Sequence, residues 1–334
     1  MPNIKKIIND PRNVVPELIE GMVEAYHGRV RLLPNGFGFA KTEIPEGKVA
    51  LLIGGGSGHE PLFHGFVGDN LADGAACGYI FTSPTPDVIL EATRAVQRGN
   101  GVLYLYGNYA GDNLNFDMAA EWAEAEGIRV QTVRIWDDIA SAPPERARER
   151  RGVAGDIFVI KIAGAAAATL PTLDEVARVT SHARDVTRTL GVAVAAGSLP
   201  ETGKPTFELG DDEIEIGMGV HGEPGVLREK IVPADALAEK MMEMLLADLP
   251  FQRGDEVCLL LNDLGSTTQM ELLIVNRKVR QILRAREIQV YDTLVGSFAT
   301  TQEMAGFSIT LMRLDDELKK YYDMPCRSLG LTKW

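Results

Sequence analysis

The stretch KVALLIGGGSGHE, residues 48–60, joins a short apolar run to a cluster of glycines. An apolar run that stops at glycines is typical of a buried strand, which we expect over Lys48–Ile53, with a loop over Gly54–Gly58. The same pattern returns in GVLYLY (Gly101–Tyr106), which runs into the loop GNYAGD (Gly107–Asp112). Two buried strands that each end in such a loop indicate a sheet with a ligand-binding edge.

Helices alternate with these strands along the chain. Apolar side chains recur at helical spacing over residues 86–99 and 113–127, and residues 173–191 have the pattern of an amphipathic helix. The alternation of strands and helices then starts again. We therefore predict two α/β domains with mostly parallel or mixed sheets and glycine-rich loops at strand ends, over residues 1–185 and 186–334.

The composition argues against several classes of protein. The chain has 334 residues, 45% of them hydrophobic, and its 34 Lys and Arg against 47 Asp and Glu give a net charge of −13. Such an acidic chain is poorly suited to bind nucleic acid. Its three cysteines are far apart and have no C-x-x-C spacing, which argues against a disulfide framework or a zinc ribbon. A polar N-terminus without a long apolar run predicts a cytoplasmic protein that does not bind membranes.

The familiar nucleotide and metal motifs are missing. The run GGGSG does not have the G-x-G-x-x-G spacing of dinucleotide-binding loops, and neither Gly-Lys pair is followed by Ser or Thr. His59 and His64 are five residues apart, whereas the zinc motif H-E-x-x-H needs four. We therefore expect no metal site, and none of the obvious nucleotide-binding loops fits.

Two histidines and one carboxylate are the candidate reactive groups. His59 and His221 each lie in a glycine-rich loop after an apolar run, and Asp112 ends GNYAGD just before a predicted helix. Each histidine is either functional or hydrogen-bonded to its own loop, and Asp112 is a helix N-cap, a catalytic group or both. Together they suggest acid–base or covalent chemistry on a small polar molecule. The four loops that could line such a site are GGGSGHE, GNYAGD, GVHGEPG and NDLGSTT.

A family resemblance rests on six segments that occur in order over nearly the whole chain: GGGSGHEPLFHGFVG, GYIFTSPTPD, NYAGDNLNF, RRGVAG, GVHGEPG and GFSIT. They resemble the substrate-binding K subunit of dihydroxyacetone kinases. The resemblance implies a two-domain α/β fold, a homodimer and a small ketose substrate. It also implies that His221 binds the ketone carbonyl covalently as a hemiaminal, which selects ketones over polyols.

The same resemblance assigns roles to the other loop residues. Asp112 is expected to be the general base that takes the proton of the attacking hydroxyl, and His59 to orient that hydroxyl. The backbone at Gly56 is expected to contact the substrate. Further substrate contacts are expected in the same loops, at Ser57, Gly58, Gly107 and Asn108.

The phosphoryl donor is expected on another protein. In the family, a separate helical L-type subunit carries ATP or ADP with magnesium, and the K portion binds no nucleotide. The resemblance therefore implies a stand-alone subunit that needs such a partner. The partner either uses ATP directly or holds an ADP that is rephosphorylated by a phosphotransferase-system protein.

The sequence departs from the family at Gly107, where a lysine usually bonds a substrate hydroxyl. Loss of this cationic donor opens space and favours a larger ketose such as erythrulose; the alternative is weaker affinity for dihydroxyacetone. A rival hypothesis is a ketose-sensing co-activator of a transcription regulator, since some relatives have that role. Asp112 and His59 favour the kinase subunit, because a sensor needs no general base. A simple sugar carrier would not explain an acid–base pair beside a nucleophile.

Overall fold

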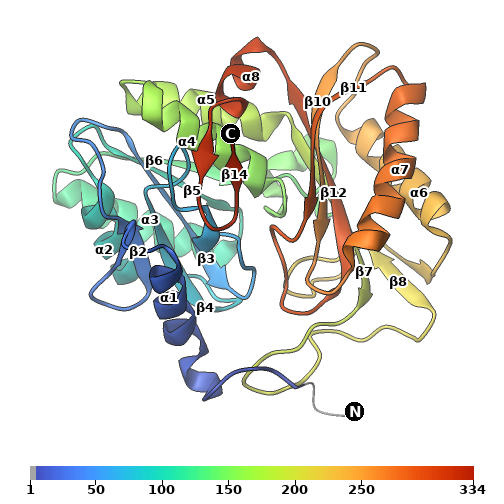
Figure 1. The fold of residues 1–334 in the computed structure, drawn as a ribbon, viewed down its shortest axis with the longest axis horizontal. Coiled ribbons are helices and arrows are strands. Elements are labelled where there is room, and N and C mark those ends of the chain that lie inside the picture. The colour runs from blue at the N-terminus through green and yellow to red at the C-terminus, as the bar shows by residue number, and fades with distance from the viewer. Residues whose placement is uncertain (1–4) are drawn as a thin grey trace. The chain divides into compact units, whose positions relative to one another are not determined.

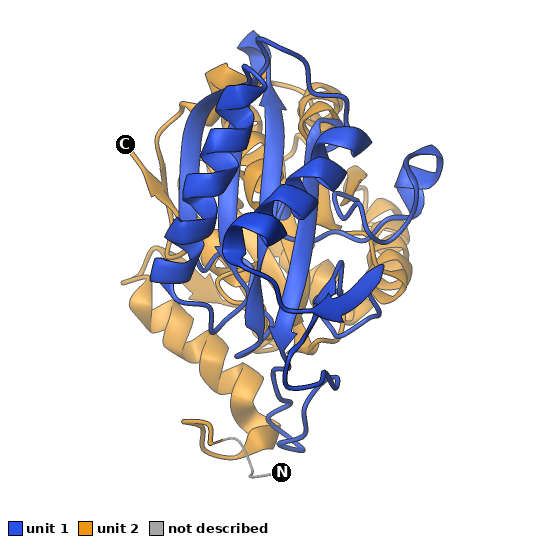
Figure 2. Ribbon diagram, turned by 90° about the vertical axis from the view of Figure 1, so that its right-hand side faces the viewer, with its two compact units in different colours: residues 1–4, 136–156, 184–317 blue, residues 5–135, 157–183, 318–334 orange. Residues whose placement is uncertain are grey.

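The computed structural model describes residues 5–334, which form two compact units (Figure 2). Of these residues, unit 1 contains Trp136–Asp156 and Arg184–Glu317. Unit 2 contains Lys5–Ile135, Ile157–Ala183 and Leu318–Trp334. Both units combine helices with a six-stranded sheet, so the predicted pair of α/β domains is confirmed as a fold class.

The division of the chain differs from the predicted single boundary after residue 185. The backbone N–H of Thr189 donates to the carbonyl of Asp137 at 2.8 Å, which ties the segment Trp136–Asp156 to unit 1. In unit 2, the Lys161 ammonium donates to the carbonyl of Tyr321 at 2.7 Å and ties down the C-terminal segment. Contacts between positions so distant in sequence leave no local signal, so the prediction placed both segments with their neighbours in the chain.

Unit 2 is built on a mostly parallel sheet. Strand β3 pairs in parallel with β4 and β5, and β5 pairs in parallel with β6, so the carboxyl ends of these four strands share one edge. The antiparallel strands β2 and β1 extend the sheet beyond β4. In spatial order the strands are β1 (Val30–Leu32), β2 (Gly38–Lys41), β4 (Gly74–Ile80), β3 (Ala50–Ser57), β5 (Val102–Gly107) and β6 (Val130–Ile135).

Helices bury the apolar side chains of this sheet. Helix α2 packs against β3 and β4, and α3 packs against β5 and β6. Pro86 opens α2, where its missing N–H costs no hydrogen bond. The α-helices that lie wholly or mostly in unit 2 are α1 (Val14–Ala25), α2 (Pro86–Val96), α3 (Ala110–Ala125), α4 (Asp156–Thr169), α5 (Leu173–Asp185) and α8 (Asp316–Tyr322).

Unit 1 contains a mixed sheet. Strands β10 and β11 are parallel, whereas β12, β7, β8 and β9 continue the sheet in antiparallel fashion. Helices α6 (Ala234–Asp248) and α7 (Gln269–Ala285) lie along one face of it (Figure 1). In spatial order its strands are β11 (Gln289–Gly296), β10 (Glu256–Asp263), β12 (Ala305–Leu314), β7 (Thr187–Ala195), β8 (Glu213–Ile216) and β9 (Leu227–Lys230).

Short elements complete the described chain. Three 3-10 helices are η1 (Pro11–Asn13), η2 (His64–Phe66) and η3 (Pro144–Glu149), and a small hairpin joins β13 (Cys326–Arg327) to β14 (Thr332–Lys333). Within residues 5–334, no helix has the length and apolar character needed to cross a membrane.

Three local predictions were wrong. The loop predicted over Gly107–Asp112 is shorter, because β5 ends at Gly107 and α3 begins at Ala110. Strand β3 continues through the glycines to Ser57, so Gly54–Ser57 is not a loop. A Cβ atom at Gly55 would lie 2.1 Å from the Phe63 ring; this glycine is needed for close packing inside the sheet rather than for a turn. The helix predicted over residues 173–191 ends at Asp185, because the following residues join the sheet as β7.

Candidate functional site

The first group of predicted residues lies at the shared carboxyl edge of the sheet in unit 2. His59 follows β3, and Asp112 follows the neighbouring parallel strand β5. The structure therefore brings these two loops to the same edge, as expected for a ligand site in an α/β sheet.

His59 is held in a tight turn and is only 5% exposed. Gly58 has φ of 100°, a left-handed conformation that glycine adopts without strain, and its N–H donates to the Glu60 carboxylate at 2.9 and 3.1 Å. The His59 ring packs on Phe81, with ring centroids 4.9 Å apart. Burial raises the pKa of Glu60. The imidazole thus has a defined position at the end of β3.

Ser57 and Gly56 are built into the sheet. The Ser57 hydroxyl donates to the carbonyl of Gly78 at 2.7 Å and lies 3.1 Å from His64 Nε2. A Cβ at Gly56 would lie 2.7 Å from the backbone nitrogen of Thr82, so the backbone of the next loop already packs against this glycine. Burial lowers the pKa of His64 to about 4, so its ring is neutral.

Asp112 occupies the first turn of α3 but is not its N-cap, which is Tyr109. The capping role that the sequence left open therefore does not hold. A carboxylate in the first helical turn is still stabilised by the helix dipole. Gly107 is the buried last residue of β5, and Asn108 accepts a hydrogen bond from the Asn113 side chain at 2.9 Å.

His221 lies in unit 1, in the turn between β8 and β9, and its side chain is 27% exposed. Its Nδ1 atom lies 3.0 Å from Glu223 Oε1, and its backbone N–H donates to Glu223 Oε2 at 2.9 Å. Burial alone would raise the pKa of Glu223, but the hydrogen bonds from His221 outweigh it and lower this pKa to about 2. Glu223 is therefore an ionised carboxylate.

This pair assigns the tautomer of His221. A carboxylate only accepts hydrogen bonds, so the proton of the neutral ring is on Nδ1. The lone pair of the neutral ring is then on Nε2. A half-buried imidazole in this state can add to a carbonyl carbon. Sequence reasoning missed Glu223, although a carboxylate two residues after a loop histidine was visible in GVHGEPG.

The loop around His221 is fixed on both sides. Gly217 and Gly222 have φ of 82° and 88°, which permits the sharp turns. The Thr301 hydroxyl donates to the carbonyl of Val220. A cavity of about 20 Å³ beside Val220, large enough for about one water, is lined by residues that include Asp138, Thr189 and Met218.

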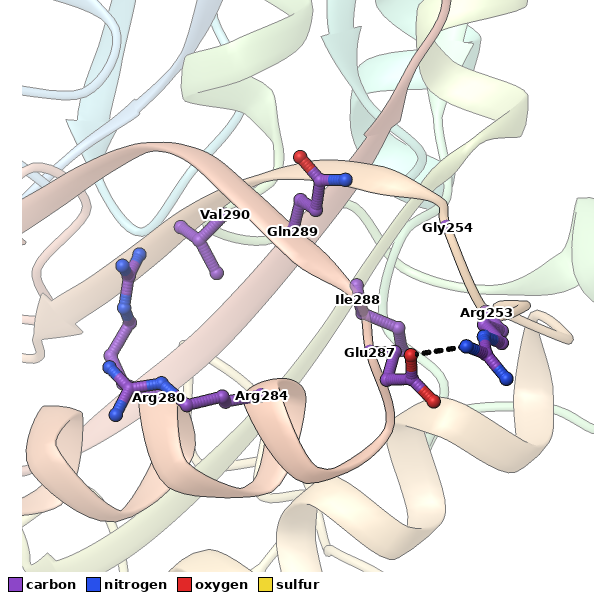
Figure 3. A pocket seen from close by; sticks show the side chains of 8 residues that line it. All are labelled: Arg253, Gly254, Arg280, Arg284, Glu287, Ile288, Gln289 and Val290. Carbon is purple, nitrogen blue, oxygen red and sulfur yellow. Dashed lines mark ion pairs between the residues drawn. The ribbon is translucent and has the colours of Figure 1, made fainter.

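A larger hollow of unit 1 contains none of the predicted residues. Its volume is about 500 Å³, and it lies at the C-terminal end of α7 (Figure 3). Arg280 and Arg284 reach it from α7, and Arg253 forms a 2.7 Å ion pair with Glu287 at its rim. Across residues 5–334, no group of three or more His, Cys, Asp or Glu side chains is placed to hold a metal ion.

The family model for the Dak1 domain matches residues 20–330 of this chain. The chain belongs to the Dak1 family. Among its Dak1 relatives, the dihydroxyacetone-binding subunit DhaK of PTS-dependent dihydroxyacetone kinase 2 from Listeria innocua is 45% identical over 325 residues. That match covers 97% of this chain and 98% of the relative. The motifs that carried the predicted resemblance therefore identified the correct family.

A kinase and a co-activator are also similar to this chain. L-erythrulose kinase from Pectobacterium atrosepticum is 41% identical over 331 residues, which are 98% of this chain but 56% of that kinase. The solved structure of the dihydroxyacetone kinase operon co-activator Dha-DhaQ superposes with a TM-score of 0.89 at 32% identity, covering 94% of this chain and 97% of that one. The Dak1 fold thus occurs both in kinases and in a co-activator.

Proposed function

We propose that this Dak1 chain is the substrate-binding subunit of a ketose kinase, a phosphotransferase with an alcohol group as acceptor, and that it holds a small ketose as a hemiaminal on His221. The observation that carries the proposal is the hydrogen bond between His221 Nδ1 and Glu223, because it leaves Nε2 as the nucleophile. The names of the similar kinases support the substrate class.

The capture step balances without a cofactor. The Nε2 lone pair forms a bond to the carbonyl carbon, the C=O π electrons move to oxygen, and that oxygen takes a proton from solvent. The ring then carries a positive charge, which the Glu223 carboxylate faces through the Nδ1 proton. A substrate with only hydroxyl groups cannot react in this way, so the step selects ketones.

Phosphoryl transfer is assigned to the residues of unit 2. Asp112 acts as general base toward the attacking terminal hydroxyl, and His59 orients it. The loop residues Gly56, Ser57, Gly58, Gly107 and Asn108 supply further substrate contacts. The donor is ATP, or ADP rephosphorylated by a phosphotransferase-system protein, bound with magnesium on an L-type subunit. The proposal includes a homodimer of this chain.

The ketose is dihydroxyacetone or a larger ketose such as erythrulose. Gly107 supports the larger substrate, because it lacks the ammonium donor and the bulk of a lysine. The similarity to an L-erythrulose kinase, at 41% identity, supports the same choice, while the 45% identity to a dihydroxyacetone-binding subunit supports the smaller one.

A second candidate function is a ketose-sensing co-activator. The similarity to the Dha-DhaQ structure favours it, because the two folds superpose over 94% of this chain. Both functions use ketose capture, but only the kinase needs Asp112. Phosphoryl transfer to a bound ketose by the chain together with its co-purifying partner would decide for the kinase; co-purification with a DNA-binding regulator and no transfer would decide for the sensor.

Native mass spectrometry tests the capture step. The wild-type chain is titrated with dihydroxyacetone, both erythrulose enantiomers and a branched ketose, and His221→Ala serves as the matched variant. We expect an adduct with the mass of the intact ketose on the wild type and none on His221→Ala. If no ketose forms an adduct with the wild type, or if the variant forms it equally, covalent capture by His221 is wrong.

A further inference from the structure

The motif RRGVAG, residues 150–155, has no role in the function proposed above. Its first arginine is structural. Arg150 is fully buried, donates to the carbonyl of Ala142 at 2.6 Å and to Asp248 Oδ1 at 2.8 Å, and so joins two distant parts of unit 1. The second arginine points to the loop that carries His221.

Arg151 connects a buried carboxylate to two points of the His221 loop. Its Nε atom donates to Asp138 Oδ2 at 2.9 Å, and its Nη2 atom donates to the carbonyl of Gly217 at 3.1 Å. Its Nη1 atom lies 3.9 Å from Glu223 Oε2. The side chain is 14% exposed, so water screens these interactions only weakly. One guanidinium thus contacts the start of the loop and faces the carboxylate that orients His221.

The loop packs tightly over this arginine. A Cβ atom at Gly219 would lie 2.4 Å from Arg151 Nη1 and 2.2 Å from Glu223 Oε2. The Gly219 N–H also donates to the carbonyl of Glu223 at 2.9 Å. Glycine at this position therefore allows close contact between the loop backbone and these charged groups. The position of the loop thus depends on the Arg151 guanidinium that packs against it.

Asp138, the buried partner of Arg151, is held in place by backbone hydrogen bonds. Asp138 is 3% exposed, and its Oδ1 accepts from the Ala140 N–H at 3.0 Å. The next residue, Ile139, donates its N–H to the carbonyl of Thr189 on β7 at 3.1 Å. Burial raises the pKa of Asp138 to about 6, although Arg151 opposes the shift. Asp138 is thus a buried anchor in a segment that is hydrogen-bonded to β7.

We propose that Arg151, anchored on Asp138, is a positioning residue for ketose capture: it holds Glu223 and the Gly217–Glu223 loop so that His221 keeps its proton on Nδ1 and its lone pair on Nε2. This inference rests on the proposed capture by His221. Without the guanidinium, the Glu223 carboxylate loses a charged neighbour and the loop loses its contact at Gly217. Outer-shell partners that orient metal-ligating histidines contribute 10- to 100-fold, and we expect an effect of similar size for Arg151.

The test compares Arg151→Met, Arg151→Lys and the control Arg228→Met in the full chain. Arg228 pairs with Glu215 at 2.7 Å in the same unit, and its side chain is 50% exposed. Two measurements are made on each variant: the apparent Kd of the dihydroxyacetone adduct by native mass spectrometry, and the ¹⁵N shifts of the His221 ring, assigned by their loss in His221→Ala.

We expect Arg151→Met to weaken the adduct about tenfold or more and to shift His221 from a single Nδ1–H tautomer toward a mixture. Arg151→Lys should restore part of both, because it keeps the charge without the planar fork, and Arg228→Met should leave both unchanged. An adduct within twofold of wild type together with unchanged ¹⁵N shifts in Arg151→Met would overturn the inference.

Two further outcomes are distinguishable. If the wild type forms no adduct with any ketose, the proposed function fails, and the ¹⁵N shifts still report whether Arg151 sets the tautomer. If Arg151→Met does not fold, Asp138→Asn replaces it, because this isostere keeps the shape of the anchor and removes its charge. Unchanged His221 shifts in a folded Asp138→Asn would then count against the inference.

Discussion

His221 Nδ1 and Glu223 Oε1 lie 3.0 Å apart in unit 1, and the same carboxylate also accepts the backbone N–H of His221. The Glu223 carboxylate thus holds both the backbone and the ring of His221. Such a bidentate arrangement orients the imidazole through Nδ1, so in the proposed capture step the bond to the carbonyl carbon falls to Nε2.

The first prediction concerns Glu223. We expect Glu223→Ala to weaken the ketose adduct by at least tenfold, because the ring loses the acceptor that holds its proton on Nδ1. Glu223→Gln should weaken it less, since the amide oxygen still accepts a hydrogen bond. Native mass spectrometry measures the adduct. Equal adduct formation in Glu223→Ala and wild type would show that the nucleophile needs no orienting group.

The second prediction concerns substrate choice. Gly107→Lys introduces a cationic donor at the last residue of β5. We expect the ratio of adduct affinities for dihydroxyacetone over erythrulose to rise, because the lysine both bonds a hydroxyl and fills the space of the larger ketose. Gly107→Met adds similar bulk without the charge and separates the two effects. A clear preference of the wild-type chain for dihydroxyacetone would contradict the larger substrate.

The fold was predictable where apolar runs and helix signals are local. Helix α7 begins at the capping box formed by Thr268 and Glu271. Strands β3 and β5 start as buried apolar runs. The end of β3 was not predictable, because the need for Gly55 depends on the ring of Phe63 folding back over it. The predicted end of the helix over residues 173–191 was wrong for a similar reason: pairing with β12 decides the conformation of β7.

The candidate site was predictable in part. The loops with His59 and His221 and the turn before Asp112 follow from glycines after apolar runs. The structure places all three residues beyond strand ends, with Asp112 in the first turn of α3. Their supporting groups were not predictable. Arg151 is 70 residues from His221 in sequence, and only the tertiary structure brings its guanidinium to the loop.

The third prediction separates capture from transfer. Asp112→Asn should keep the ketose adduct within about threefold, because His221 and Glu223 are untouched, while phosphoryl transfer with the partner falls about 100-fold or more for want of a general base. An enzyme-coupled assay with ATP and the co-purifying partner measures transfer. If transfer persists near the wild-type rate, Asp112 is not the base; if the adduct is lost instead, Asp112 acts in binding.

The fourth prediction uses the buried His64. Its pKa is about 4 in the folded chain and 6.5 when unperturbed, so the unfolded chain binds the proton more readily. The contribution of His64 to the free energy of unfolding is therefore full above pH 6.5 and is lost as the pH falls toward 4, by roughly 3 kcal/mol in all. His64→Gln can still reach the Ser57 hydroxyl. In this variant the urea concentration at the midpoint of unfolding should depend less on pH between 6.5 and 4. An equally steep pH dependence in His64→Gln and wild type would show that His64 does not carry this loss.

The fifth prediction concerns Arg150, the structural arginine of RRGVAG. Its side chain is fully buried against Asp248, whose side chain is 7% exposed, so removing the guanidinium leaves a carboxylate that water barely reaches. Asp248 keeps one partner, Arg188, at 2.6 Å. We therefore expect Arg150→Met to lower the free energy of unfolding by about 3 kcal/mol, at the low end for a broken buried ion pair.

The matched control for this prediction is Arg94→Met. Arg94 also pairs with a carboxylate, that of Glu126, but its side chain is 53% exposed, so its loss should cost less than about 1 kcal/mol. Urea unfolding monitored by circular dichroism measures both variants. If Arg150→Met is as stable as Arg94→Met, then Arg188 alone satisfies Asp248, and the buried arginine of RRGVAG is not needed for the stability of unit 1.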